Sequence, residues 1–126
     1  MKRYDPFQAP VPAEWLALNE TQRLELVERY HGELKIPLRN VGGHAAAHTS
    51  VETQLAEAYA PAVRALTRLL NEGLDRHQAV HAIGSVLMEH QWNLANKPRR
   101  PGDVDAPYVA ALDALNVESW LRPKDK

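Results

Sequence analysis

Apolar residues recur along this chain every three or four positions, which is the period of an α-helix with one buried face. Four such stripes, in chain order, are Leu24, Leu26, Val27 and Tyr30; His44, Ala47, His48, Val51, Leu55 and Ala58; Val63, Leu66, Leu69 and Leu70; and Val80, Ile83, Gly84, Leu87 and Met88. No stretch of useful length alternates apolar and polar residues as a half-buried strand would. The pattern predicts an all-α protein, a small bundle of about four to five helices.

Capping-box pairs mark the start of two of these helices. Asn19 with Gln22 forms the first pair, and Asp75 with Gln78 forms the second. In each pair the two side chains can satisfy backbone N–H groups that have no partner inside the helix. The second pair predicts a helix that runs to about Trp92.

Proline, glycine and charged residues separate the predicted elements. The helix that begins after Asn19 is expected to stop at Gly32, and a last short helix is expected from Asp105 through Leu115. We predict a single helical domain with these parts: an extended proline-rich strap (1–14), core helices (15–92), a loop (96–105), a C-terminal helical segment (106–121) and a frayed tail (122–126).

Composition narrows the class of protein. With 126 residues, 44% of them hydrophobic and 25% charged, the chain is large enough for one globular domain with its own core. The absence of cysteine excludes disulfides, thiolate catalysis and cysteine-ligated zinc. Lysine and arginine total 15 against 16 aspartate and glutamate residues, a balance that argues against a general electrostatic affinity for nucleic acid or an anionic membrane. The basic loop with Lys97, Arg99 and Arg100 leaves nucleic-acid binding as a third, more distant hypothesis.

The chain contains neither a membrane span nor a signal peptide that we can recognise. No apolar run approaches the roughly 18 residues that a membrane-spanning helix needs. The basic residues at the start of the chain are not followed by the apolar stretch of a signal peptide. We therefore expect a cytoplasmic protein.

Four of the six histidines fall into two pairs with the same spacing, His44 with His48 and His77 with His81. Residues four apart lie on one face of a helix, so each pair places two imidazoles side by side. Imidazole is the commonest side-chain ligand of metals in proteins. The two pairs therefore predict a metal site or a histidine-rich polar core.

Whether the two pairs meet depends on Pro61, which stands between them. An unbroken helix from residue 44 to residue 72 would be roughly 43 Å long and would keep the pairs apart. Proline suits the first turn of a helix and disfavours helical angles in the residue before it. We therefore expect a break near Ala60 and three segments that run up, down and up, with both pairs at the same end of the bundle.

One carboxylate is well placed to join the imidazoles, because Glu52 follows His48 by four residues. The expected ligand set for a divalent transition metal such as zinc, iron or nickel is His44, His48, Glu52, His77 and His81. A hydrolytic role would need a metal-bound water, and the His-Glu-x-x-His pattern of zinc hydrolases is missing. The sequence assigns no catalytic residue and indicates no organic cofactor.

The alternative is a non-enzymatic interaction or oligomerisation domain, such as a homodimer, in which the histidines form a buried polar network. A histidine on an apolar stripe is often a core residue that a carboxylate or a carbonyl satisfies. Such a protein would bind no metal, and its melting temperature would fall between about pH 7 and pH 5 as buried neutral imidazoles become charged.

A resemblance to a known family rests on four segments within residues 13–91. They are Trp15-Leu16-Ala17-Leu18-Asn19-Glu20, Tyr30-His31, His44-Ala-Ala-Ala-His48 with Glu52-Thr-Gln54-Leu-Ala, and Gly73-Leu-Asp-Arg-His77-Gln-Ala-Val-His81-Ala-Ile-Gly84-Ser. In this order they resemble small uncharacterised bacterial helical proteins grouped as domain of unknown function 1841. The resemblance implies a bacterial origin and a helical fold, and it implies no activity, substrate or metal.

Overall fold

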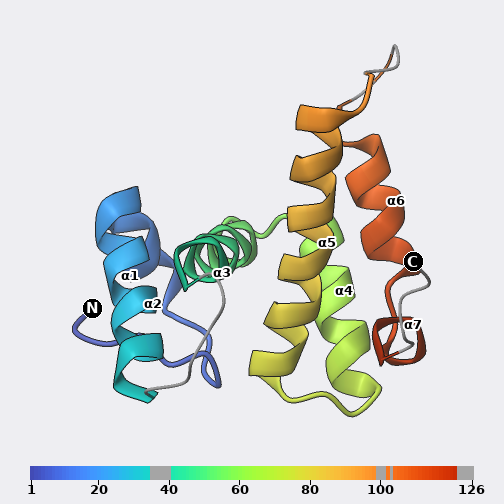
Figure 1. Cartoon of the computed structure of the whole chain (residues 1–126). Helices are drawn as coiled ribbons and strands as arrows, with labels where there is room; N and C mark the ends of the chain where they lie inside the picture. Colours follow the sequence, from blue (N-terminus) through green and yellow to red (C-terminus); the bar gives the residue numbers. More distant parts are fainter. Residues whose placement is uncertain (35–40, 99–101, 103, 122–126) are drawn as a thin grey trace.

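The computed structural model describes residues 1–34, 41–98, 102 and 104–121. Its helices are α1 (Pro12–Ala17), α2 (Glu20–Leu34), α3 (Val41–Ala56), α4 (Ala60–Asn71), α5 (Arg76–Asn96), α6 (Ala106–Ala114) and α7 (Val117–Leu121) (Figure 1). The described residues contain no strand, so the all-α prediction is confirmed. The helix count exceeds the expected four to five because α1 and α7 add short helices of 6 and 5 residues.

The N-terminal segment is only partly as expected. Residues 1–11 contain no helix, but α1 begins at Pro12, inside the stretch 1–14 that the sequence predicted to be extended. Proline is accommodated in the first turn of a helix because its missing N–H would have no intrahelical partner there. The prediction was therefore wrong for residues 12–14, and the helix places Trp15 in a fully buried position.

Both predicted capping boxes are present. Asn19 Oδ1 accepts from the Gln22 N–H at 2.8 Å, while the Asn19 N–H donates to Gln22 Oε1 at 2.9 Å. At α5, Asp75 Oδ1 accepts from the Gln78 N–H at 2.7 Å and the Asp75 N–H donates to Gln78 Oε1 at 3.0 Å. These local signals fixed the starts of α2 and α5 correctly.

Two helices continue beyond the ends that the sequence predicted. α2 continues through Gly32 to Leu34, and α5 continues past Trp92 to Asn96. A glycine inside a helix costs only about 1 kcal/mol relative to alanine, so it does not end a helix by itself.

The C-terminal part begins its helix as predicted. α6 starts directly after Asp105, with a proline in its first turn, and ends at Ala114. Within the expected loop 96–105, residues 99–101 and 103 lie outside the described residues, as does the expected tail 122–126.

The helical segment that begins with α3 is interrupted before Pro61, as predicted. α3 ends at Ala56, Ala58 has a φ of 56°, and Pro61 lies in the first turn of α4. α4 then runs antiparallel to α5, but α3 lies across α5 rather than parallel to it (Figure 1). The up-down-up arrangement is therefore wrong for α3, because the left-handed conformation of Ala58 redirects the chain before α4 begins.

α3 lies between two groups of buried residues. The first, under α1 and α2, consists of Tyr4, Trp15, Leu26, Val27 and Ala45. The second, between α3, α4, α5 and α6, consists of Val51, Ala65, Leu69, Ala79, Val80, Ala82, Ile83, Leu87, Tyr108, Leu112 and Leu115. α3 thus contributes one side chain to each cluster, and the residues between Ala45 and Val51 lie where the clusters adjoin.

Small residues allow α3 and α5 to approach closely. A Cβ atom on Gly84 of α5 would lie 3.5 Å from Ala47 Cβ and 3.9 Å from Val51 Cγ2 of α3. This contact brings the middle of α3 near the first turns of α5, where the second histidine pair is located.

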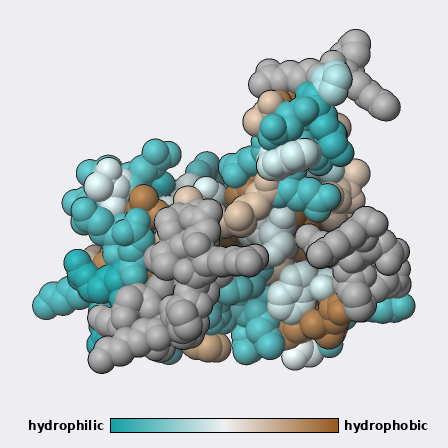
Figure 2. Space-filling model, viewed as in Figure 1, coloured by the Kyte–Doolittle hydropathy of each residue, from teal (hydrophilic) through white to brown (hydrophobic). Residues whose placement is uncertain are grey.

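In the view of Figure 2 the visible described residues are mainly hydrophilic, with separate hydrophobic spots. None of the described helices combines the length and the hydropathy needed to cross a membrane.

Candidate metal centre

Two histidines lie on the first turns of α5. The Asp75 cap fixes the start of the helix, so His77 is its second residue and His81 follows one turn later. Their ring centroids are 4.6 Å apart and their planes are inclined at 84°. The spacing of four residues therefore places both imidazoles on the same face of α5, as the sequence predicted.

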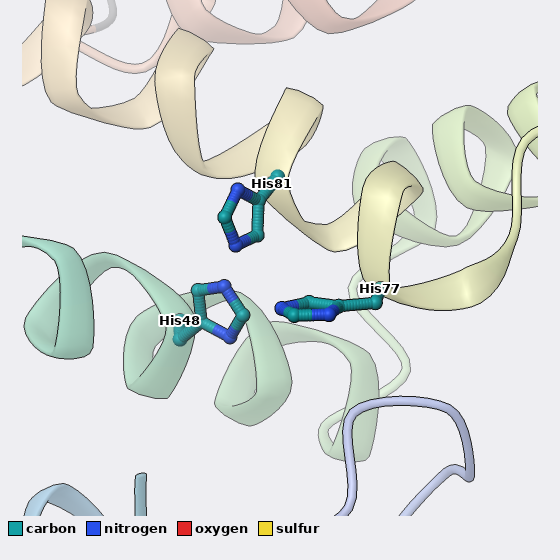
Figure 3. Close-up of side chains that lie close together, drawn as sticks. All are labelled: His48, His77 and His81. Carbon is teal, nitrogen blue, oxygen red and sulfur yellow. The ribbon is translucent and has the colours of Figure 1, made fainter. Parts of the chain in front are cut away.

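The third histidine comes from α3. His48 is 2% exposed, and its ring centroid lies 5.2 Å from that of His77 and 4.5 Å from that of His81. Figure 3 shows the three rings converging on the space between α3 and the start of α5. One nitrogen from each imidazole can be chosen so that all three lie within 4.8 Å of one another.

Aromatic rings from the segment before α1 lie against this histidine group. The Nε2 atoms of His48, His77 and His81 are all shielded from solvent. Tyr4 meets His48 edge-on with ring centroids 6.3 Å apart, and Phe7 meets His77 in the same way at 5.3 Å. The segment before α1 thus covers one side of the group.

A buried ion pair connects the two helices beside the histidines. Arg76 donates from Nη1 and Nη2 to the two carboxylate oxygens of Glu52, each at 2.7 Å, and the side chains are 11% and 0% exposed. Tyr4 donates its hydroxyl proton to Glu52 Oε2 at 2.5 Å, and Arg76 also donates to the carbonyl of Pro6 at 3.0 Å. Since Glu52 follows His48 by one turn and Arg76 precedes His77, this network holds α3, α5 and the N-terminal segment together.

The network determines the charge of its members. Burial, together with the charge of Glu52 and the hydrogen bond to it, raises the pKa of Tyr4 far above its usual range, so Tyr4 remains a neutral hydroxyl. Burial alone would lower the pKa of Arg76, but the hydrogen bonds and charge of Glu52 outweigh it, and the pKa of Arg76 is raised. Arg76 is therefore a cation opposite Glu52.

Three of the expected ligands come together, namely His48, His77 and His81. His44 belongs to α3, but its side chain lies outside the described residues. Glu52 is close by in the fold, yet its carboxylate faces Arg76 and Tyr4 and does not belong to the group of convergent nitrogens.

Arg76 and Tyr4 were not predicted from the sequence to be part of this region. A signal for Arg76 was present, because a cation in the first turn of a helix opposes the helix dipole and needs an anion nearby. No comparable signal marks Tyr4, whose partner Glu52 is 48 residues away in the chain.

Comparisons with protein-family models, with curated proteins and with solved structures found no match to this chain. The resemblance to domain of unknown function 1841 therefore stays a prediction.

Proposed function

We propose that this protein binds one divalent transition metal ion through His48, His77 and His81. The observation that carries the proposal is the convergence of three ring nitrogens from two helices, all within 4.8 Å of one another. Zinc holds histidine nitrogens at about 2.0–2.1 Å, and tetrahedral ligation then places two such nitrogens roughly 3.3 Å apart. Small rotations of the imidazoles would close the remaining distance.

The ligand type narrows the choice of metal. Imidazole suits zinc, nickel and iron(II), whereas magnesium and calcium prefer oxygen ligands. The acidic side chain nearest the group, Glu52, is engaged by Arg76 and Tyr4. A site of nitrogen ligands therefore favours zinc, nickel or iron.

The tautomer of the His48 ring bears on the proposed metal binding. The single hydroxyl proton of Tyr4 is donated to Glu52, so a hydrogen bond across the 3.4 Å contact between Tyr4 and His48 Nδ1 requires the His48 tautomer that carries its proton on Nδ1. A proton on Nδ1 leaves the lone pair on Nε2, where a metal can accept it. Tyr4 and Glu52 would then orient His48 as partners of metal-binding histidines commonly do.

The number of ligands bears on the kind of site. Three protein ligands leave one tetrahedral position open, as in catalytic zinc centres, while four ligands are typical of structural centres. His44, one turn before His48, is our proposed fourth ligand. Zinc binding that weakens in His44→Ala would indicate a closed site, and binding that does not change would indicate an open one.

Calorimetric titration with zinc tests the proposal. We expect one ion per chain, and we expect His81→Ala to weaken binding by more than about 100-fold, since it removes a ligand rather than a supporting partner. His90→Phe, at a buried histidine on the same helix outside the group, is the matched control and should bind as the wild type does. Circular dichroism would confirm that both variants fold.

The alternative function, a metal-free interaction domain with a buried histidine network, also stays a prediction. The edge-on packing of His48 against the buried ring of Tyr4 is the observation that favours it, because such packing stabilises a core without an ion. Wild-type protein that shows no heat of zinc binding, or His81→Ala protein that binds zinc as tightly as the wild type, would favour this function.

A further inference from the structure

A second site lies further along α5, away from the histidine group. A pocket of about 350 Å³ opens beside His90, between the ends of α3 and α5 and the start of α6. His90 follows His81 by nine residues, which is roughly 13 Å along a helix. The pocket therefore shares no residue with the proposed metal centre.

His90 is the buried polar group of this pocket. The residue is 8% exposed, and its Nε2 has no hydrogen-bond partner among the described residues. The nearest carboxylate oxygen, Oδ1 of Asp105, is 4.0 Å away, which is too long for a hydrogen bond. Buried polar atoms are nearly always satisfied in native proteins, so a molecule that enters the pocket is the natural partner of this nitrogen.

Two parallel tyrosine rings line the pocket, of which Tyr108 is 3% exposed and Tyr59 is half-buried. The Tyr108 ring stacks on His90 with centroids 5.4 Å apart and an interplanar angle of 24°. It is also parallel to Tyr59, with an angle of 5° and centroids 6.5 Å apart. The Tyr108 hydroxyl donates to Gln54 Oε1 at 2.7 Å, which fixes the orientation of the ring.

The charged groups of the pocket are acidic. Glu57 and Asp105 line it and are both exposed, whereas no lysine or arginine belongs to its described lining. An aromatic wall below two carboxylates attracts a cation and repels an anion.

We propose that this pocket binds a small organic cation that carries an ammonium or amidinium group on a flat apolar body. A small rotation of the His90 ring would turn its shielded Nε2 toward the pocket, where a ligand nitrogen can donate to it and to Asp105 Oδ1. The flat body then packs against Tyr59, and Glu57 adds long-range attraction. His90 acts as an acceptor in this arrangement.

Benzamidine and benzoate test this proposal, because they share a flat ring and carry opposite charges. We expect benzamidine to shift the NMR signals of the His90 and Tyr108 rings and to bind at least about tenfold more tightly than benzoate. His90→Phe keeps a ring against Tyr108 but removes the acceptor, and it should weaken benzamidine binding by about tenfold or more. Asp105→Asn should weaken binding by about fivefold, which is the upper range for an exposed charge pair.

Two control variants distinguish benzamidine binding in this pocket from a general charge effect and from binding at the proposed metal centre. Glu89→Gln removes an exposed carboxylate from the same helix outside the pocket, and His81→Ala alters the metal centre. Neither should change benzamidine binding. The proposal would be overturned if benzoate bound as tightly as benzamidine, if the shifts appeared away from His90, or if Asp105→Asn and Glu89→Gln had equal effects. The proposal would also be contradicted if zinc shifted the NMR signals of the His90 ring in His81→Ala protein.

Discussion

At the scale of single residues, the candidate site depends on a carboxylate that is buried completely. Glu52 has no exposed side-chain surface, and its charge is compensated by Arg76 and by the hydroxyl of Tyr4. Removing one partner of a buried ion pair is costly because the other charge then stays buried alone. The same three side chains connect α3 to α5 beside His48 and His77, so stability and the proposed metal binding depend on the same contacts.

Glu52→Gln should therefore lower the free energy of unfolding by about 3–5 kcal/mol, measured by urea denaturation. Asp113→Asn is the matched control, since it breaks the Arg64–Asp113 pair, whose side chains are 53% and 46% exposed. Exposed pairs contribute about 0–1 kcal/mol, so the control should change little. Equal losses in the two variants would show that the Glu52 pair contributes no more than a surface pair.

The buried tyrosines predict how stability responds to alkali. Burial raises the pKa of Tyr108 to about 12 and that of Tyr4 still further, whereas an unfolded tyrosine ionises near pH 10. Above pH 10 the unfolded chain therefore binds fewer protons than the folded chain, and the free energy of unfolding should fall as the pH rises. Urea denaturation between about pH 9 and pH 11 should show a shallower fall for Tyr4→Phe than for the wild type. Identical slopes would contradict the burial of an un-ionised Tyr4.

At the scale of elements, local signals predicted how helices begin but not how they cross. The capping boxes at Asn19 and Asp75 act within four residues, so the sequence alone located the starts of α2 and α5. The left-handed turn at Ala58 was unpredictable, because alanine has no preference for a positive φ and only the tertiary fold can impose it. The histidine spacing predicted that His77 and His81 share a face of α5. The approach of His48 to these two residues depends on how α3 crosses α5, which the spacing does not determine.

The two capping boxes provide a matched test of how α5 supports the proposed metal centre. Asp75→Ala and Asn19→Ala should each lower the free energy of unfolding by about 1 kcal/mol, the usual loss for a helix N-cap. Only Asp75→Ala should also weaken zinc binding, because His77 is the second residue of α5. Calorimetric titration of both variants measures the difference, and an equal decrease in zinc affinity would mean that the cap acts only through overall stability.

At the scale of the whole molecule, the histidine group lies where separate parts of the fold adjoin. α3 contributes Ala45 to one buried cluster and Val51 to the other, and His48 lies between them in the chain. The segment before α1 adds Tyr4 and the carbonyl of Pro6, which Arg76 binds. Such convergence of distant segments cannot be read from periodicity, which is why the sequence predicted the histidines and the nearby Glu52 but not Tyr4 or Arg76.

The metal content of the protein is the most direct test of the central claim. Untagged protein, purified without a chelator or a nickel column, would be measured by inductively coupled plasma mass spectrometry, before and after incubation with zinc, iron or nickel salts and gel filtration. We predict one transition metal ion per chain in the wild type and in His90→Phe, and a large loss in His81→Ala. Wild-type protein that retains no metal after incubation, or equal metal content in wild type and His81→Ala, would contradict the metal centre.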